Sequence, residues 1–307
     1  MKLYRYSQAS PHNIDDGPYR NCVPLGIDGL EKHCTIVNDP EEADYFHIGQ
    51  IREDSTVKLY QSDGSEFEYF KGNEHRHIVD MEGEGGWDIP EWMRKCILTT
   101  MGPLKKYKYY KLFTRPCFSS LMIDCSKDDR QFDFPAKPGF GFRGCLNHPT
   151  REILFKALKE PDLDTKRIRR EAYMTPGWYG PAPSRSEPHL IFEELMLKHP
   201  LSLCPRGAGI ASTRVIETCF YGRIPVIVSD EDFYQVGEDI YDTSFMFKII
   251  GNLSPKDMAN QLISIYNTNI GELKDRGDAA KQYFNKVIKK YFDDPTLFFI
   301  NWLKNND

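Results

Sequence analysis

The sequence predicts an α/β protein built as two similar halves, each with a parallel sheet covered by helices. Short apolar runs of strand length alternate with helical or loop segments, which is typical of parallel sheets. The polar stretch 126–139 interrupts this alternation, which then begins again. With 307 residues, 40% of them hydrophobic, the chain can form two cores. We therefore expect Rossmann-like domains at 1–130 and 131–280 that face a cleft, and C-terminal helices at 281–307 that dock on the body.

The first half contains a series of short apolar segments separated by polar turns. Between two of them, the residues PEEAD (40–44) are expected to form a helical turn, and a glycine-rich turn follows the segment that ends near residue 82. The strands expected here are 2–6, 34–39, 45–51, 75–82, 112–116 and 119–125.

The second half repeats the pattern with clearer helices. One of these, 254–267, begins with Ser254 as its cap and Pro255 at its first position. Aromatic and aliphatic residues at helical spacing over 283–292 predict a final helical segment that docks on a core. The other expected elements are strands at 139–144, 167–174, 201–205 and 224–230, and helices at 189–199 and 212–222.

Composition excludes several classes of protein. No apolar run approaches the roughly 20 residues of a membrane span, and the N-terminal residues lack the apolar core of a signal peptide. The eight cysteines are scattered without a CxxC pair, so we expect reduced thiols and a cytoplasmic protein. Residues 137–223 hold 14 Lys and Arg against 9 Asp and Glu in a chain of net charge −5. Such a local basic region favours an anionic ligand over nucleic acid.

One stretch, LCPRGAGIASTRVIETCFYGRIPVIVSD (203–230), combines features that suit a phosphate-bearing ligand. A glycine-containing loop leaves a strand and leads into a helix, whose amino-terminal amides and dipole favour anions. Arg206 and Arg214 supply guanidinium groups for a diphosphate. Glu217, one turn deeper, suits the acceptor role toward ribose hydroxyls. The bland alternative is a solvated Arg214–Glu217 pair beside an ordinary turn.

The same stretch resembles the signature of the exostosin-like glycosyltransferases, glycosyltransferase family 47. Two further segments agree: DPEEADYFHI (39–48) is similar to an element of the family's N-terminal half, and GFRGCLNHPTREIL (141–154) resembles the strand that opens its second half, with Arg151 starting the next helix. The matching residues of the signature are Cys204, Pro205, Arg206, Gly207, Ser212, Arg214, Glu217, Gly222, Pro225 and Val226.

The resemblance implies a GT-B architecture and inverting transfer of a sugar from a UDP-sugar to a glycan hydroxyl, without an essential metal or other cofactor. By position, Arg206 and Arg214 would hold the diphosphate and Glu217 the ribose. Weaker candidates for the phosphate wall are Arg143, Arg169 and Arg170, and the loop and helix start contribute Gly207, Ser212 and Thr213 to the same binding set. The family typically carries a Golgi membrane anchor. The lack of one here points to a soluble microbial or viral enzyme.

The donor sugar, the acceptor and the oligomeric state are not identified by these motifs. Xylose or another pentose, a hexuronic acid and a hexose all remain open as donors. An inverting transfer needs a general base, expected in the N-terminal half. Glu82 and Glu84, after the strand 75–82, are the first candidates, and Asp15 and Asp16 compete with them.

Other readings compete with this hypothesis. Asp230 and Asp232 form a D-x-D after a strand, as in metal-dependent GT-A glycosyltransferases, which leaves Arg206 and Glu217 without a role. A non-catalytic nucleotide- or glycan-binding module would share the site but turn over no donor. GFGFRG (139–144) matches a dinucleotide fingerprint, but the residues are expected to form the strand itself, so the match is accidental.

Overall fold

The computed structural model describes residues 1–6, 32–51, 64–65, 67–81, 89, 91–101, 104–107, 111–115, 130–175, 187–207, 209, 211–233 and 235–306. The chain divides into two compact units. The first combines residues 1–117 with 290–307, and the second comprises 118–289. The C-terminal segment expected at 281–307 is thus shared between the units.

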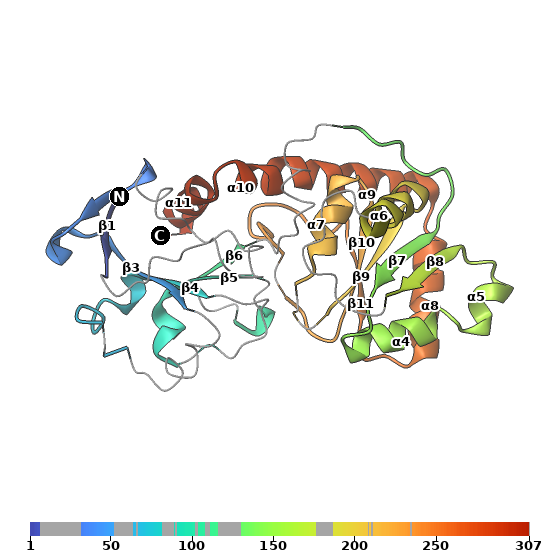
Figure 1. Cartoon of the computed structure of the whole chain (residues 1–307), viewed down its shortest axis with the longest axis horizontal. Helices are drawn as coiled ribbons and strands as arrows, with labels where there is room; N and C mark the ends of the chain where they lie inside the picture. Colours follow the sequence, from blue (N-terminus) through green and yellow to red (C-terminus); the bar gives the residue numbers. More distant parts are fainter. Residues whose placement is uncertain are drawn as a thin grey trace. The chain divides into compact units, whose positions relative to one another are not determined.

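The first unit contains a six-stranded parallel sheet with the order β2-β1-β3-β4-β5-β6 (Figure 1). The order reverses beside β1, because β2 lies on one side of it and β3 on the other. Its strands are β1 (Lys2–Arg5), β2 (Thr35–Val37), β3 (Tyr45–Ile51), β4 (His77–Met81), β5 (Ile97–Met101) and β6 (Lys111–Arg115). The sequence pattern had not predicted β5, and the strand expected at 119–125 lies outside the described residues.

The two faces of this sheet are covered differently. One carries a cluster rich in aromatic residues that includes Phe46, Phe70 and Trp92. On the other, Phe113 of β6 contacts aromatic residues of α10 (Lys289–Asp293) and α11 (Pro295–Asn306). Among the described residues of this unit are also four short 3-10 helices: η1 (Pro40–Glu42), η2 (Glu74–Arg76), η3 (Glu91–Lys95) and η4 (Lys105–Tyr107).

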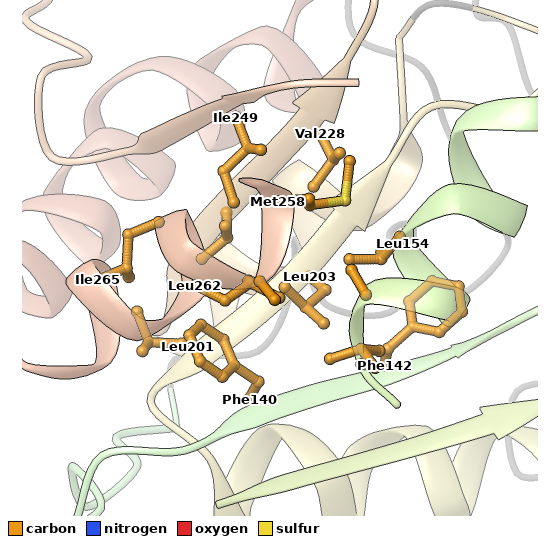
Figure 2. Close-up of a cluster of buried hydrophobic side chains, with 14 of the residues drawn as sticks. Phe140, Phe142, Leu154, Leu201, Leu203, Val228, Ile249, Met258, Leu262 and Ile265 are labelled. Atoms are coloured by element: carbon orange, nitrogen blue, oxygen red, sulfur yellow. The ribbon is translucent and has the colours of Figure 1, made fainter. Parts of the chain in front are cut away.

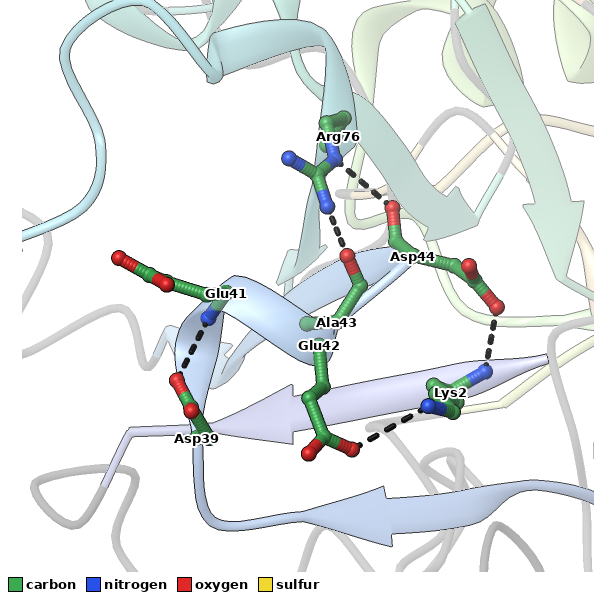
Figure 3. A network of polar contacts seen from close by, with 7 residues as sticks. All are labelled: Lys2, Asp39, Glu41, Glu42, Ala43, Asp44 and Arg76. Atoms are coloured by element: carbon green, nitrogen blue, oxygen red, sulfur yellow. Dashed lines mark hydrogen bonds and ion pairs between the residues drawn. The ribbon is translucent and has the colours of Figure 1, made fainter.

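The acidic segment before β3 has a structural role (Figure 3). Asp39 caps η1 by accepting from the Glu41 amide at 2.9 Å. Asp44 accepts from the Lys2 amide at 2.6 Å, which ties the segment to β1. The Arg76 guanidinium donates to the main-chain carbonyls of Ala43 and Asp44. The Asp39 and Asp44 carboxylates of this segment thus have structural partners within the first unit.

His77 is fully buried in the aromatic face of the first unit. Its ring stacks on Phe46 with centroids 4.7 Å apart. The Nδ1 atom lies 2.8 Å from the Asn73 carbonyl and therefore donates, which leaves Nε2 to accept from the Tyr6 hydroxyl at 2.9 Å. Burial lowers the pKa of His77 from 6.5 to about 4. The folded protein consequently keeps this ring neutral.

Acid is expected to destabilise the protein through His77. The unfolded chain binds a proton below pH 6.5, whereas the folded chain does so only near pH 4, so stability is lost as pH falls through this window. The loss reaches roughly 3 kcal/mol at the lower end. Urea midpoints of wild type and His77→Phe at pH 7.5 and 4.5 check this. The wild type should lose more stability than the variant, and equal losses would contradict it.

The second unit contains a five-stranded parallel sheet with the order β11-β10-β9-β7-β8. Its strands are β7 (Phe140–Gly144), β8 (Arg170–Met174), β9 (Leu201–Pro205), β10 (Ile224–Ser229) and β11 (Phe247–Ile250). Strand β7 leads to β8 on one side, and the chain then crosses to β9 on the other side. This reversal is a topological switch point, where open α/β sheets bind ligands at the carboxyl ends of their strands.

Helices cover both faces of this sheet (Figure 1). One face packs against α4 (Pro149–Ala157) and α8 (Pro255–Tyr266), with α5 (Pro161–Thr165) beside α8. The other contacts α6 (Glu187–Lys198), α7 (Thr213–Phe220) and α9 (Ile270–Tyr283). A π-helical turn, η5 (Phe284–Ile288), continues α9. Figure 2 shows the core between this sheet and α4 and α8. There, Met258 and Leu262 of α8 and Leu154 of α4 pack against the sheet residues Leu201 and Leu203.

The expected α/β fold with two parallel sheets is confirmed. Ser254 caps α8 and Pro255 occupies its first turn, as predicted. GFGFRG supplies strand β7. The polar stretch 126–139 differs from a free linker over its described part, because Phe132 contacts Tyr221 at 4.8 Å between ring centroids and Phe134 packs against the core of the second unit. Two aromatic residues thus attach this segment to the second unit, although its charged residues predicted a solvent-exposed linker.

Two further expectations can be compared with the described residues. Within them, no helix is both long and apolar enough to cross a membrane. The cysteines that the structure describes are free thiols: Cys34, Cys96, Cys145, Cys204 and Cys219.

Candidate functional site

The candidate site lies at the carboxyl edge of the second sheet, around the switch point between β7 and β9. Three loops leave the sheet here: residues 145–148 lead from β7 to α4, residues 206–212 lead from β9 to α7, and residue 230 follows β10. Parallel pairing in register places their starting points at one edge. The signature loop therefore begins where the topology predicts a ligand site.

Arg151, in the first turn of α4, joins the two loops that flank the switch point. Its Nε donates to the Arg206 carbonyl at 3.0 Å and one terminal nitrogen donates to the Cys145 carbonyl at 3.0 Å. The other terminal nitrogen lies 3.4 Å from the Pro205 carbonyl. A single guanidinium thus fixes the main chain at the ends of both β7 and β9.

Gly207 lies directly against that guanidinium. A Cβ atom added at this position would meet a terminal nitrogen of Arg151 at 2.9 Å and the Asn147 side-chain amide at 3.3 Å. Any larger side chain would have to displace Arg151 from its carbonyl partners. The glycine predicted to let the backbone approach a ligand is therefore also required by this internal contact.

Arg206 is the first residue after β9 and has a mostly buried side chain. A terminal nitrogen pairs with the Asp230 carboxylate at 2.7 Å. Its Nε is buried and has no hydrogen-bond partner among the described residues. The main chain is anchored separately, because the Arg206 amide donates to the Val228 carbonyl at 2.9 Å. Arg206 therefore retains hydrogen-bonding capacity while its backbone is fixed.

Helix α7 forms as the sequence predicts. Ser212 is its N-cap in an extended conformation, although its side chain makes no capping bond, and Thr213 is its first residue. The predicted apolar face, Val215, Ile216, Cys219 and Phe220, is buried. After the helix, Gly222 takes a φ of 64°, which a side chain would disfavour.

The two charged residues of α7, Arg214 and Glu217, are less exposed than an ion pair on the protein surface would be. The Arg214 guanidinium lies 5.0 Å from the ring centroids of both Phe142 and Phe192, and it donates to the Arg143 carbonyl. Glu217 is only 8% exposed. The bland alternative of a solvated surface pair is therefore contradicted. Arg214 also has a clear structural role, since cation–π contacts and a carbonyl bond hold it.

His148 belongs to the same edge and was not singled out from the sequence. It is the N-cap of α4, and its Nδ1 accepts from the Thr150 amide at 3.2 Å. Burial first, and then the positive charge of Arg206, lower the pKa of His148 from its usual value of 6.5. The Asp230 carboxylate raises it in opposition. A neutral imidazole thus lies within electrostatic reach of the Arg206–Asp230 pair.

The three weaker arginine candidates are separated by the sheet register. Arg143 lies one residue before the carboxyl end of β7, close to the site. Arg169 and Arg170 stand at the amino end of β8, because Arg170 pairs with Phe140, the first residue of β7. The Arg170 guanidinium also donates hydrogen bonds to the Leu158 carbonyl at 2.7 Å and to the Asp164 carboxylate at 2.9 Å. The structure therefore does not bring Arg169 and Arg170 together with Arg206.

The D-x-D carboxylates each face a cation. Asp230 pairs with Arg206, and Asp232 lies 3.5 Å from the Lys248 ammonium. Across the described residues, no three His, Cys, Asp or Glu side chains gather into a metal-binding group. Each carboxylate of the D-x-D therefore already has a cationic partner in this structure.

All four predicted base candidates, Glu82, Glu84, Asp15 and Asp16, lie outside the described residues. The described part of the first sheet does contain a buried polar row at β3, β4 and β5. There, Thr99 donates to Asp80, and the His47 Nε2 atom lies 3.8 Å from the Asp80 carboxylate. His47 is only 3% exposed, so a solute does not reach it in this conformation.

Comparison with known proteins adds distant likenesses. No protein-family model matches the chain, and no curated protein does so. Among solved structures, a TarM variant from S. aureus, in complex with fondaparinux, α-GlcNAc-glycerol and UDP, aligns over 86% of this chain at 12% identity and a TM-score of 0.41. The chain covers 52% of that structure, about half its length.

An α1,3-fucosyltransferase aligns over 90% of this chain and 80% of its own, at 12% identity and a TM-score of 0.40. Its complex with GDP-fucose gives a TM-score of 0.38 at the same identity and coverage. Similarity at this level identifies neither a family nor a substrate for this chain.

Proposed function

We propose that the protein is an inverting glycosyltransferase that moves a sugar from a UDP-sugar to the hydroxyl group of a glycan. The observation that carries the proposal is that Arg206, Arg214 and Arg143 all belong to segments at the carboxyl edge of the second sheet, where Arg214 donates to the Arg143 carbonyl. Positively charged side chains at the carboxyl edge of a parallel sheet suit a nucleotide diphosphate. The resemblance of residues 203–230 to exostosin-like enzymes supports the same ligand.

The diphosphate would lie over the loop 206–212, within reach of the Arg206 guanidinium and of the first amides of α7. Arg214 extends the positive charge toward β7. Glu217 would accept hydrogen bonds from ribose hydroxyls, and its burial requires the nucleoside to pack directly against α7. The arginines stabilise charge that develops on the diphosphate as it leaves, a role that metal ions fill elsewhere.

The reaction is a single displacement. The acceptor oxygen forms a bond to the anomeric carbon while the bond from that carbon to the diphosphate oxygen breaks. A carboxylate takes the proton of the acceptor hydroxyl, and UDP leaves with the bonding electron pair. Glu82 and Glu84, with Asp15 and Asp16 in competition, remain the proposed bases. Xylose or another pentose is the proposed donor sugar, without an essential metal, in a cytoplasmic enzyme.

A nucleotide screen followed by a turnover assay tests the proposal. In calorimetry, UDP should bind more tightly than GDP or ADP, and at least one UDP-sugar should be hydrolysed slowly or transferred in the presence of EDTA. UDP binding without turnover of any UDP-sugar would indicate a binding module. A strict manganese requirement would favour the metal-dependent alternative. Absence of binding to any nucleotide would overturn the assignment.

A further inference from the structure

The Arg206–Asp230 ion pair occupies the place where the proposed function puts the diphosphate. We infer that Asp230 is a displaceable counter-ion of Arg206: it holds the guanidinium while the site is free, gives way to the phosphate, and returns as UDP leaves. The inference rests on the proposed function, since it concerns the same site. It assigns to Asp230 control of nucleotide affinity and release rather than metal binding.

The geometry of the pair makes a side-chain exchange feasible. The carboxylate meets Arg206 through one oxygen at 2.7 Å, and its side chain is 34% exposed against 13% for Arg206. The main chain of Asp230 packs closely against Gly251, where an added Cβ would meet the Asp230 amide nitrogen at 2.7 Å. Next to it, the Gly251 amide donates to the Ser229 carbonyl at 2.8 Å. Rotation of one accessible side chain therefore suffices to uncover Arg206.

Arg206 itself is prepared for a second partner. The buried Nε atom has no described hydrogen-bond partner, so the single bond to Asp230 leaves the guanidinium incompletely satisfied. Guanidinium groups bind phosphate through two parallel bonds, which is a better match than one carboxylate oxygen. A diphosphate can therefore replace Asp230 with a net gain in hydrogen bonds.

Charge balance explains why such a counter-ion would help an enzyme. Arg206, Arg214 and Arg143 attract the trianionic UDP product as well as the donor, so an uncompensated site would release UDP slowly. A carboxylate attached to the same edge competes locally for Arg206 and repels the departing phosphate. Asp230 thereby lowers affinity for the product, and it acts through Arg206 as a positioning residue.

Asp230→Asn tests the inference, because asparagine keeps the shape and removes the charge. UDP affinity should rise about tenfold, and the increase should come from slower dissociation. The UDP dissociation rate would be measured by stopped-flow displacement and affinity by calorimetry. In turnover, both KM and kcat should fall, because product release becomes slower. Asp278→Asn removes the same charge from an exposed position on α9, and it should change neither the affinity for UDP nor the UDP dissociation rate.

The outcomes separate this inference from the proposed function. If the wild type binds pyrophosphate but not UDP, the proposed function fails, and Asp230→Asn is then tested on pyrophosphate with the same expected gain. Unchanged or weaker binding by the variant overturns the counter-ion role. Failure of the wild type to bind either anion overturns both. If Asp230→Asn does not fold, Asp230→Ser makes the same charge change with a smaller side chain.

Discussion

Arg206→Ala is expected to reduce UDP affinity at least about 100-fold while the variant remains folded. A bidentate guanidinium–phosphate contact contributes roughly 3 kcal/mol, which corresponds to this factor. The fold should tolerate the change, because the Arg206 side chain pairs with the partly exposed Asp230 and the main-chain bond of Arg206 to Val228 persists. Calorimetry with UDP, together with a thermal melt, measures both effects.

Arg206 gives a cleaner test than Arg214. The Arg214 guanidinium is held between Phe142 and Phe192 and donates to the Arg143 carbonyl, so truncation there would also disturb packing. Loss of UDP binding in Arg214→Ala would therefore have two explanations. Arg206 separates ligand binding from stability because fewer internal contacts depend on its side chain.

A matched control comes from the opposite edge of the same sheet. Arg169→Ala makes the same chemical change next to the amino end of β8, where the Arg169 side chain has no hydrogen bond or ion pair with other described residues. UDP affinity should be unchanged there. Equal losses in the two variants would mean that net charge alone attracts the nucleotide. An unchanged affinity in Arg206→Ala would place the ligand elsewhere.

Arg223→Ala is expected to destabilise the second unit by about 3–5 kcal/mol. Arg223 is 1% exposed, and burial lowers the pKa of its guanidinium to about 10. It donates to the main-chain carbonyls of Met196 at the end of α6 and of Asp133 in the segment before β7. Alanine would leave both carbonyls without this donor and open a cavity. Urea unfolding of wild type and variant measures the loss.

Two controls make the Arg223 result specific. Arg94→Ala removes an exposed arginine whose ion pair with Glu91 spans 3.5 Å, and it should cost less than about 1 kcal/mol. Arg223→Lys keeps the charge but not the fork geometry, so an intermediate loss is expected. A cost for Arg223→Ala as small as that for Arg94→Ala would show that the two carbonyls find other partners.

Periodicity and capping residues predicted the local structure around the site well. Strand β9, helix α7 and strand β10 occur where apolar runs, Ser212 and Gly222 indicated. Strands, helices and helix ends depend mainly on residues that are close together in the sequence, so they can be predicted from the sequence alone. Strands β5 and β11 were missed because ILTTM and FKII are short runs without strong turn signals on both sides.

Partnerships between distant residues could not be predicted in this way. Arg169 and Arg170 were candidates because of their charge, but only the pairing register places them at the amino edge of the sheet. Arg151 and Arg223 bind main-chain carbonyls, which every residue possesses, so no residue type in the sequence marks their partners. From the sequence alone, a charged residue beside a glycine is predicted to be exposed, and only the tertiary structure shows that it is buried.

The discontinuity of the first unit has a consequence for biosynthesis. Its sheet is formed by residues 1–117, yet α11, which covers Phe113, belongs to 290–307 and leaves the ribosome after the whole second unit. The second unit is continuous and has its complete sheet before that point. During translation Phe113 is therefore made long before the helix that covers it, and we expect a nascent chain stalled before residue 290 to expose this aromatic side chain.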